Sequence, residues 1–278
     1  MSTNVEFPSV TYPLLRMAEM DKDVTVKLVE ADELIVPLNS ILDEIDEDTQ
    51  AVFINHVDNL SGQVHDIERI TRYAHENGAL VVVDDIQAAG CLPLNVRKLG
   101  IDAYIIGSYK YLCAPFGVVI AYISKELYER AMPVFVGWRT SEVIWDFDSE
   151  KITYPSTARK FEYSTSAYGV KLGLAESIKY LLNVGIHNIH SHDLKLVAML
   201  KEEFDEGAPL NVITPTDHGS IFTFRPLNME SGDVAARLRS TFRPVELSVR
   251  QVLIRLSPHL YNTEEDIQEV IESLKQVL

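Results

Sequence analysis

Cysteine is scarce in this chain of 278 residues, which holds only Cys91 and Cys113 and no Cys-x-x-Cys pair. A disulfide framework and a cysteine-ligated zinc site are therefore not expected, and unpaired thiols are typical of a reducing, cytoplasmic compartment. Apolar runs of the ~20 residues needed to span a membrane are also lacking. Residues 1–13 have neither the basic nor the apolar region of a secretory signal peptide. These gaps predict a cytoplasmic protein that has no membrane anchor.

Basic residues are few as well: 25 lysines and arginines stand against 41 aspartates and glutamates, giving a formal net charge of −16. Such a chain repels a phosphate polymer on average, so we expect no nucleic-acid partner, although a local basic pocket for a small anion remains open. Hydrophobic residues make up 46% of the chain and charged residues 24%, as in ordinary globular proteins. The length allows one large domain or two modest ones.

Strand-like apolar runs alternate with helix-like segments through the first half of the chain. The run at residues 80–83 is apolar throughout and rich in valine, which is typical of a parallel strand covered on both faces. Such alternation predicts an α/β fold with a mostly parallel sheet. The predicted strands are residues 24–29, 51–55, 80–83, 104–106 and 118–122, and the predicted helices are residues 62–77 and 96–99.

The pattern changes in the second half of the chain. Residues 133–155 are irregular and aromatic, and residues 166–185 are expected to form one long helix. A smaller α+β unit follows, and its last helix opens with Thr263-x-x-Asp266, close to a capping box. We place the boundary within the long helix, which gives domains at residues 1–175 and 176–278. The elements expected in the smaller unit are helices at residues 194–204, 233–241 and 264–277 and strands at residues 221–225 and 252–256.

Polar and charged side chains follow three of the predicted strands, at the point where each strand ends. They are His56 and Asn59 after residues 51–55, Asp84, Asp85 and Gln87 after residues 80–83, and Ser108 and Lys110 after residues 104–106. In open α/β sheets, ligands bind beyond the carboxyl ends of the strands. A surface lysine or a carboxylate that caps a turn explains any one of these residues taken alone. Their convergence predicts a crevice that offers an acid, an amide, a hydroxyl and an amine to one ligand.

The spacing of these residues resembles that of a known enzyme family. Val83-Asp84-x-x-Gln87 followed by Ser108-x-Lys110 is similar to the cofactor segment of fold-type I pyridoxal phosphate enzymes, in particular the class V aminotransferase family. That family includes cysteine desulfurases, isopenicillin N epimerase-like proteins and kynureninase-like proteins. Further segments resemble the family in the same order, at residues 6–13, 55–62, 159–165 and 255–263, with Ser164 in place of a glycine. The resemblance covers essentially the whole chain and implies a three-layer transferase-like fold, incomplete at the N-terminus, with the smaller C-terminal domain.

The resemblance also implies how a cofactor is held. Lys110 would form a Schiff base with the aldehyde of pyridoxal 5'-phosphate and would then act as the base at the substrate Cα. Asp84 would keep the pyridine nitrogen protonated, because an opposite charge favours the charged form of a group. Gln87 would hydrogen-bond the ring hydroxyl, and Arg255 would bind the α-carboxylate of an amino-acid substrate. Lys110, Asp84 and Gln87 are thus the catalytic candidates.

Other positions would complete the cofactor site by resemblance. Phe7 falls where the family has the residue that stacks on the cofactor ring, and Asn59 would lie near the ring hydroxyl. Ser108 would contact the phosphate, and Tyr109 stands where many members have a histidine. Thr165 matches the threonine that reaches the phosphate of the neighbouring subunit, so a homodimer is expected.

Three departures from the family pattern matter. Members carry a Gly/Thr-rich loop that grips the phosphate ahead of the segment at residues 6–13, and this sequence has no such loop, no Gly-x-Gly-x-x-Gly and no P-loop. A truncated reading frame, a split enzyme and a decayed paralogue would each explain this. Residues 240–251 contain no cysteine, so a cysteine desulfurase, which needs a thiolate there, is not expected. Asp85 occupies a position where the family usually has glycine.

Two functions remain in competition at the level of the sequence. The first is a pyridoxal phosphate-dependent, aminotransferase-like enzyme that carries out transamination, racemisation or Cβ elimination on an amino acid. The second is a truncated, inactive protein that binds a partner, or one half of a split enzyme. Neither calls for a metal, since His187, His190 and His192 are expected at a solvated helix–loop junction and acidic residues 43–48 at a solvated helix end. His259 is expected to shape the turn before the last helix.

Overall fold

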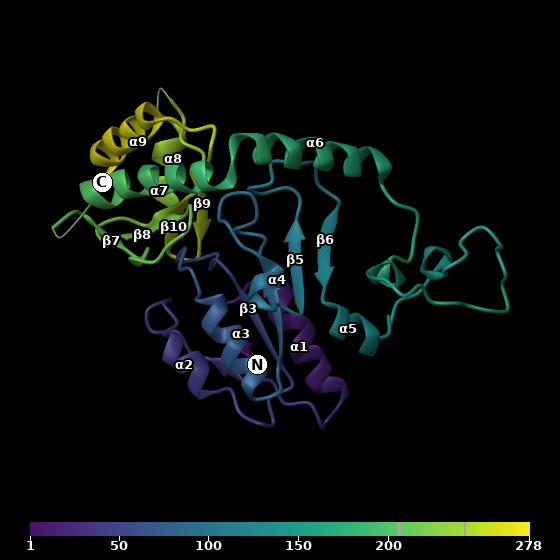
Figure 1. Ribbon diagram of the computed structural model, residues 1–278. Helices are drawn as coiled ribbons and strands as arrows, with labels where there is room; N and C mark the ends of the chain where they lie inside the picture. The colour runs from purple at the N-terminus through teal and green to yellow at the C-terminus, as the bar shows by residue number, and fades with distance from the viewer. Residues whose placement is uncertain (205–206, 242) are drawn as a thin grey trace.

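The computed structural model describes residues 1–204, 207–241 and 243–278, and two four-stranded sheets form its frame (Figure 1). The elements up to the end of the first sheet are β1 (Ser2–Thr3), α1 (Pro8–Met20), β2 (Leu28–Val29), α2 (Leu38–Asp43), β3 (Ala51–Asn55), α3 (Ile67–Glu76), β4 (Leu80–Asp84), α4 (Val96–Leu99), β5 (Ala103–Gly107) and β6 (Val119–Ile123). The elements that follow are α5 (Lys125–Arg130), the 3₁₀ helices η1 (Trp138–Thr140) and η2 (Ala158–Phe161), α6 (Tyr168–Val184), α7 (Ile186–Glu203), β7 (Leu210–Val212), β8 (Phe222–Pro226), α8 (Ser231–Arg239), β9 (Ser248–Arg250), β10 (Leu253–Leu256) and α9 (Glu264–Val277).

The first sheet has the strand order β3-β4-β5-β6, in which β3, β4 and β5 are parallel and β6 is antiparallel to β5. This confirms the prediction of a mostly parallel sheet. Its apolar side chains pack with those of α2 and α3 in a core that includes Ile41, Val52, Ile70, Val81 and Val83. In the ladder, Asn55 pairs with Asp84 and Asp84 with Ile105, so the carboxyl ends of β3, β4 and β5 lie side by side.

The second sheet is antiparallel throughout, with the order β7-β8-β10-β9. Helices α7, α8 and α9 gather around it (Figure 1) and share its apolar core. Fully buried members of that core are Leu196, Phe222, Phe224, Leu238 and Ile254. This confirms the smaller α+β unit predicted after the long helix. The predicted division between residues 175 and 176 falls inside α6 and stays a prediction.

A third apolar core joins α6 and α7 to the first sheet. Tyr111, the residue after Lys110, shares this core with Leu181 of α6 and Ile189 of α7. All three of these side chains are buried. The loop that carries Lys110 is therefore attached to the helices that lead into the second sheet, and not only to β5.

The strand predicted at residues 24–29 is wrong for most of its length. Only Leu28–Val29 pair, in parallel with Ser2 and Thr3 of β1. The alternation of polar and apolar residues is present, but β1 reaches only the end of this segment. Ser2 donates its N–H to the Lys27 oxygen at 2.9 Å, and Asn4 donates to the Val29 oxygen at 3.0 Å. An extended segment without a neighbouring strand has no ladder in which to place its N–H and C=O groups.

Two helices begin at residues other than those predicted. α3 starts at Ile67 rather than residue 62, because the side chain of Asp66 caps it by accepting a hydrogen bond from the N–H of Arg69. α7 starts directly after Gly185, whose φ of +92° marks the break from α6. α6 and α9 confirm the predicted helices, and α9 opens with the predicted capping box.

The segment between α5 and α6 extends away from both sheets (Figure 1). It exposes large apolar side chains, among them Val134, Phe135 and Trp145. The rings of Trp138, Trp145 and Phe147 lie against one another there. In the described ranges, no helix combines the length and the apolar character that crossing a membrane requires.

Candidate active site

A cavity of about 230 Å³ opens beyond the carboxyl ends of the parallel strands. It is lined by Gln87, Tyr109, Lys110, Tyr111, Arg255, Ser257, His259 and Tyr261. Gln87 follows β4, the tyrosines and Lys110 follow β5, and Arg255 lies on β10 of the second sheet. Four residues predicted from the sequence, namely Gln87, Tyr109, Lys110 and Arg255, thus meet at one cavity that both halves of the chain build.

The side chain of Lys110 is partly buried in the loop after β5. Its Nζ lies 5.8 Å from the centroid of the Phe7 ring, which brings the predicted stacking residue to the predicted lysine. Burial and the positive charge of Arg255 lower the pKa of Lys110 to about 8, although the carboxylate of Asp84 acts in the opposite direction. A substantial fraction of this amine is therefore neutral at mildly alkaline pH.

Asp84 stands at the end of β4, near enough to Lys110 for their charges to interact. Its Oδ1 accepts a hydrogen bond from the N–H of Ile86 at 2.9 Å, so Asp84 also caps the turn that follows β4. Burial raises the pKa of Asp84, while the Ile86 hydrogen bond and the charge of Lys110 oppose that rise. The acid and the amine named from the sequence thus influence each other across the strand ends.

Asp85, which replaces the usual glycine, is fully buried behind Asp84. Its Oδ1 lies 2.6 Å from Nδ1 of His56, and its Oδ2 accepts a short hydrogen bond from the hydroxyl of Tyr104. His56 follows β3, Asp85 follows β4 and Tyr104 belongs to β5. The additional carboxylate therefore connects three adjacent strands, because its two oxygens both have partners.

Arg255 reaches the cavity from β10. Its Nη1 donates a hydrogen bond to the backbone oxygen of Asn59 at 2.5 Å, so one donor group of the guanidinium already has a partner. Its Nε is buried and has no acceptor among the described residues. A buried donor without a partner costs free energy, and Arg255 is also one of the residues that line the cavity.

A further carboxyl group, that of Glu6, is buried near enough to Asp84 for their charges to interact. Its Oε1 accepts a hydrogen bond from the N–H of Asn55 at 2.6 Å, whereas Oε2 has no partner among the described residues. Burial raises the pKa of Glu6 to about 8, and the charges of Asp58 and Asp84 add to this effect. The resemblance marked Glu6 only as a neighbour of Phe7, and no sequence pattern indicated its burial.

Three other predicted cofactor residues have different surroundings. Ser108 is fully buried, and its Oγ donates to the backbone oxygen of Pro115 at 2.5 Å. Thr165 is exposed in the segment before α6. Asn59 is buried and meets the site through its backbone oxygen, as described above. Within the described part of this one chain, five predicted site residues do not line the cavity, and their roles stay predictions: Phe7, Asn59, Asp84, Ser108 and Thr165.

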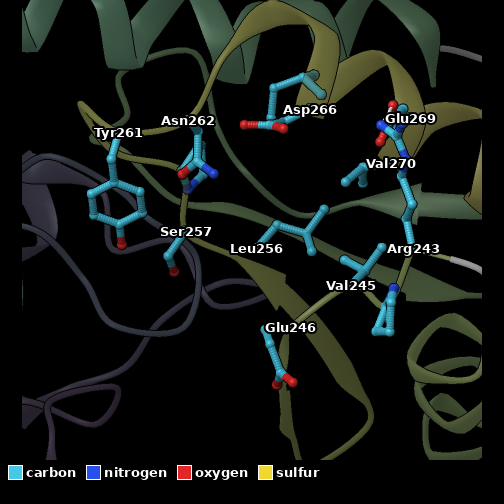
Figure 2. Close-up of a pocket in the computed structure, with 13 residues that line it drawn as sticks. Arg243, Val245, Glu246, Leu256, Ser257, Tyr261, Asn262, Asp266, Glu269 and Val270 are labelled. Atoms are coloured by element: carbon cyan, nitrogen blue, oxygen red, sulfur yellow. Dashed lines mark hydrogen bonds and ion pairs between the residues drawn. The ribbon is translucent and has the colours of Figure 1, made fainter.

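A larger cavity, of about 480 Å³, adjoins the first one and shares Ser257 and Tyr261 with it. Figure 2 shows these two side chains at one end and the ion pair of Arg243 and Glu269 at the other. Residues 243–246 line this cavity, and they belong to the segment in which a desulfurase of the family would carry its cysteine. Here that segment contributes arginine, proline, valine and glutamate.

Both cysteines lie elsewhere in the fold. Cys91 is buried, and Cys113 is exposed in the turn after Lys110, where its N–H donates to the Lys110 carbonyl at 2.8 Å. Across the described ranges, no three His, Cys, Asp or Glu side chains are grouped as ligands of a metal ion. His192 instead pairs its Nε2 with the backbone oxygen of Asn262 at 2.9 Å.

Comparison with known proteins agrees with this geometry: residues 1–270 match the sequence profile of the family described as aminotransferase class V. The chain belongs to this family. A probable cysteine desulfurase of Methanothermobacter thermautotrophicus is 30% identical over 99% of this chain and 72% of its own length. The uncharacterized aminotransferase YcbU of Bacillus subtilis is 27% identical over 98% of this chain and 70% of its own. An apo structure of a cysteine desulfurase from Thermococcus onnurineus NA1 has a TM-score of 0.89 at 25% identity, covering 99% of this chain and 71% of that one.

Family membership confirms the resemblance and the fold predicted from the sequence. Enzymes of the class V aminotransferase family use pyridoxal 5'-phosphate, and the residues of this cavity fit that group. Among the lining side chains, an amine at Lys110 suits its aldehyde and an amide at Gln87 suits its hydroxyl. The carboxyl group of Asp84, which would suit the ring nitrogen, stands at the end of β4 and is not one of the lining residues.

Proposed function

We propose that this chain is a pyridoxal phosphate-dependent enzyme that acts on an α-amino acid at Cα. The observation that carries the proposal is the single cavity at which Gln87, Lys110 and Arg255 converge from two sheets. Bound there, the cofactor supplies an aldehyde that takes up an amine and a pyridinium ring that withdraws electrons. Lys110 would hold it as a Schiff base, with Asp84 at the ring nitrogen and Phe7 near the ring.

Lys110 suits two tasks because its amine is less basic than usual. A neutral amine can attack an aldehyde, and it can also take a proton from the substrate Cα and return it. Both tasks need a pKa near the working pH, and burial together with Arg255 lowers the pKa of Lys110 to about 8. The same residue thus serves as the attachment point and as the general base.

Arg255 would select for a carboxylate on the substrate. Its guanidinium is fixed by the hydrogen bond to the Asn59 backbone oxygen, and its buried Nε still lacks an acceptor. A planar guanidinium binds a carboxylate with two parallel hydrogen bonds, which orients the amino acid as well as retaining it. Transamination is the reaction we propose first, since it needs a lysine base but no protein thiol.

Absorbance spectroscopy tests the proposal directly. Purified protein is mixed with pyridoxal phosphate, and the visible band of lysine-bound cofactor is followed in the wild type, in Lys110→Ala and in Lys98→Ala. Lys98 is exposed on α4, so its variant controls for reaction at surface lysines. We expect the band in the wild type and in Lys98→Ala and its loss in Lys110→Ala. A band that survives in Lys110→Ala would assign the cofactor to another residue.

Cleavage at the C–S bond of cysteine is the second candidate, favoured by the names of the relatives from M. thermautotrophicus and T. onnurineus. Residues 240–251 lack the thiol that accepts sulfur in such desulfurases, and Cys113 is the exposed thiol of this chain. The products of incubation with L-cysteine distinguish the reactions. Alanine with transferred sulfur indicates desulfuration, and pyruvate with sulfide indicates Cβ elimination. 3-Mercaptopyruvate indicates transamination, and D-cysteine indicates racemisation.

A non-enzymatic remnant, or one half of a split enzyme, is the less favoured alternative, because the matched relatives are named as enzymes. We also propose a homodimer in the cytoplasm. Support for the dimer comes from the exposed apolar side chains between α5 and α6, including Phe135 and Trp145, which form a surface larger than single scattered residues would. Sedimentation equilibrium tests it, and a monomer at micromolar concentration would contradict it.

A further inference from the structure

We propose that His259 is a positioning residue for Lys110, acting as a buried imidazolium that fixes the loop on which Lys110 stands. This inference rests on the proposed role of Lys110 as the cofactor-binding lysine. His259 lies in the turn between β10 and α9, and sequence reasoning assigned it only to the shape of that turn. The backbone supports that role too, since the His259 N–H donates to Oδ1 of Asn262 at 3.1 Å. The side chain, however, is directed elsewhere.

Both ring nitrogens of His259 face acceptors. Nδ1 lies 2.9 Å from Oδ2 of Asp193 on α7, and Nε2 lies 2.9 Å from the backbone oxygen of Tyr111. A carbonyl oxygen can only accept a hydrogen bond, and so can a carboxylate. Both nitrogens must therefore donate, which makes the ring a cation. His259 is 2% exposed and Asp193 is fully buried, so water does not replace either partner.

Tyr111 is held at two points, one of them by this ion pair. The ring of His259 contacts the carbonyl oxygen of Tyr111, and the hydroxyl of Tyr111 donates to the backbone oxygen of Ser220 at 3.0 Å. Ser220 in turn donates its own hydroxyl to Oδ2 of Asp193 at 2.8 Å. Tyr111 thus has both ends attached to the C-terminal unit, and it is joined by one peptide bond to Lys110. The direction in which the Lys110 side chain enters the cavity follows from that attachment.

The charge on the ring strengthens this attachment, because hydrogen bonds from a cation are about twice as strong as neutral ones. Burial lowers the pKa of His259, but the hydrogen bonds and charges of Asp193 and Cys113 outweigh it and raise that pKa to about 9. Asp193 belongs to α7, while Cys113 and Tyr111 belong to the Lys110 loop and Tyr261 lies in the same turn as His259. The ring therefore remains charged at neutral pH.

Two conservative variants separate positioning from simple structural support. His259→Gln places an amide donor near the position of Nε2, toward the Tyr111 carbonyl, whereas His259→Asn places one near the position of Nδ1, toward Asp193. The measurement is the dissociation constant of pyridoxal phosphate by absorbance titration at pH 7.5, with circular dichroism to verify folding. His187→Gln, an exposed position on α7, is the matched control.

We expect His187→Gln to bind pyridoxal phosphate as the wild type does. His259→Gln, which keeps a neutral donor to the Tyr111 carbonyl but loses the charge, should bind it a few-fold more weakly. His259→Asn, which loses the hydrogen bond to that carbonyl, should bind it about tenfold more weakly. Equal binding by a folded His259→Asn would overturn the inference while leaving the proposed function intact. A wild type that takes up no pyridoxal phosphate would overturn both.

Nuclear magnetic resonance keeps the inference testable if a variant does not fold. The nitrogen chemical shifts of His259 in the wild type report directly whether Nδ1 and Nε2 both carry protons. We expect both to be protonated at pH 7. A single neutral tautomer at that pH would contradict the proposed cation, whatever the variants do.

Discussion

Nδ1 of His56 lies 2.6 Å from Oδ1 of Asp85, and both side chains are buried beneath the candidate cavity. Asp85 also accepts a hydrogen bond from Tyr104, so its two oxygens join residues that follow β3 and belong to β5. A glycine at this position, as the family usually has, could make neither contact. The carboxyl ends of these strands, which carry the proposed cofactor residues, are therefore joined through the side chain of Asp85.

Removing that charge should weaken the fold. Asp85→Ala leaves His56 and Tyr104 buried without their shared acceptor, which by analogy with other broken buried pairs costs about 3 kcal/mol of unfolding free energy. Urea denaturation at pH 7 measures the change. Asp43→Ala, at an exposed position at the end of α2, is the control and should change stability by less than about 0.5 kcal/mol. An Asp85→Ala protein as stable as this control would show that the pair contributes little.

The rate at which Lys110 captures pyridoxal phosphate should depend on pH. Only the neutral amine attacks an aldehyde, and the pKa of Lys110 is lowered to about 8 by burial and by Arg255. The initial rate is therefore expected to rise with pH and to reach half its maximum near pH 8. Stopped-flow absorbance measures it, with a free lysine derivative for comparison. A midpoint near that of the free amine, well above pH 9, would contradict the lowered pKa.

The contribution of His259 to stability should disappear on the alkaline side. Because the pKa of His259 is about 9 in the folded protein and 6.5 in the unfolded chain, its stabilisation is complete below pH 6.5 and is lost as pH rises through 9. By linkage the loss amounts to about 3 kcal/mol at most. The difference in unfolding free energy between wild type and His259→Gln, measured in urea at pH 6, 7.5 and 9.5, should shrink accordingly.

The wild type has to be compared with His259→Gln because Lys110 also makes stability depend on pH. Its contribution becomes more favourable as pH rises, whereas that of His259 is lost. The lowered pKa of Lys110 means that the unfolded chain binds more protons above pH 8, so its effect on stability becomes more favourable as pH rises. This effect is common to the wild type and His259→Gln and cancels in the difference. A difference that stays constant from pH 6 to pH 9.5 would exclude the charged form of His259.

Substrate recognition should depend on the shape of Arg255 as well as on its charge. Arg255→Lys keeps a cation but cannot form two parallel hydrogen bonds to a carboxylate. Titration of the cofactor-loaded protein with L-alanine should then give a dissociation constant roughly tenfold to a hundredfold higher. Ethylamine, which has no carboxylate, should bind both proteins alike. Arg225→Lys, at an exposed position on β8, is the control, and equal L-alanine affinity in all three proteins would remove Arg255 from the substrate site.

Much of this site could be predicted from the sequence, because the carboxyl ends of parallel strands lie at the same edge of the sheet. Apolar runs that stop at Asp84 and before Lys110 predict two such ends, and the register of β3, β4 and β5 makes them adjacent. Arg255, far away in the chain, was placed by resemblance alone, and its contact with the Asn59 backbone bears out its proximity. Helical and strand periodicity could not have supplied that contact.

Other features of the site could not be predicted from the sequence, because the interacting residues are distant in the chain or carry no sign that they are buried. His259 and Asp193 are 66 residues apart and come from a turn and a helix, so no local pattern links them. Glu6 carries no sign of burial in its neighbours, and α1 begins at Pro8 and contains Pro13, which hides its helical character. The strand predicted at residues 24–29 failed for the opposite reason, since its pattern was present and its partner strand was short.

Attachment of the cofactor to Lys110 is the central claim, and chemical trapping tests it most directly. Wild-type protein loaded with pyridoxal phosphate is reduced with borohydride, digested, and mapped by mass spectrometry. We predict that the mass of the reduced cofactor is found on the peptide that contains Lys110, at close to one equivalent per chain. Its appearance on a different lysine, or spread over exposed lysines such as Lys98 at the same level, would contradict the account.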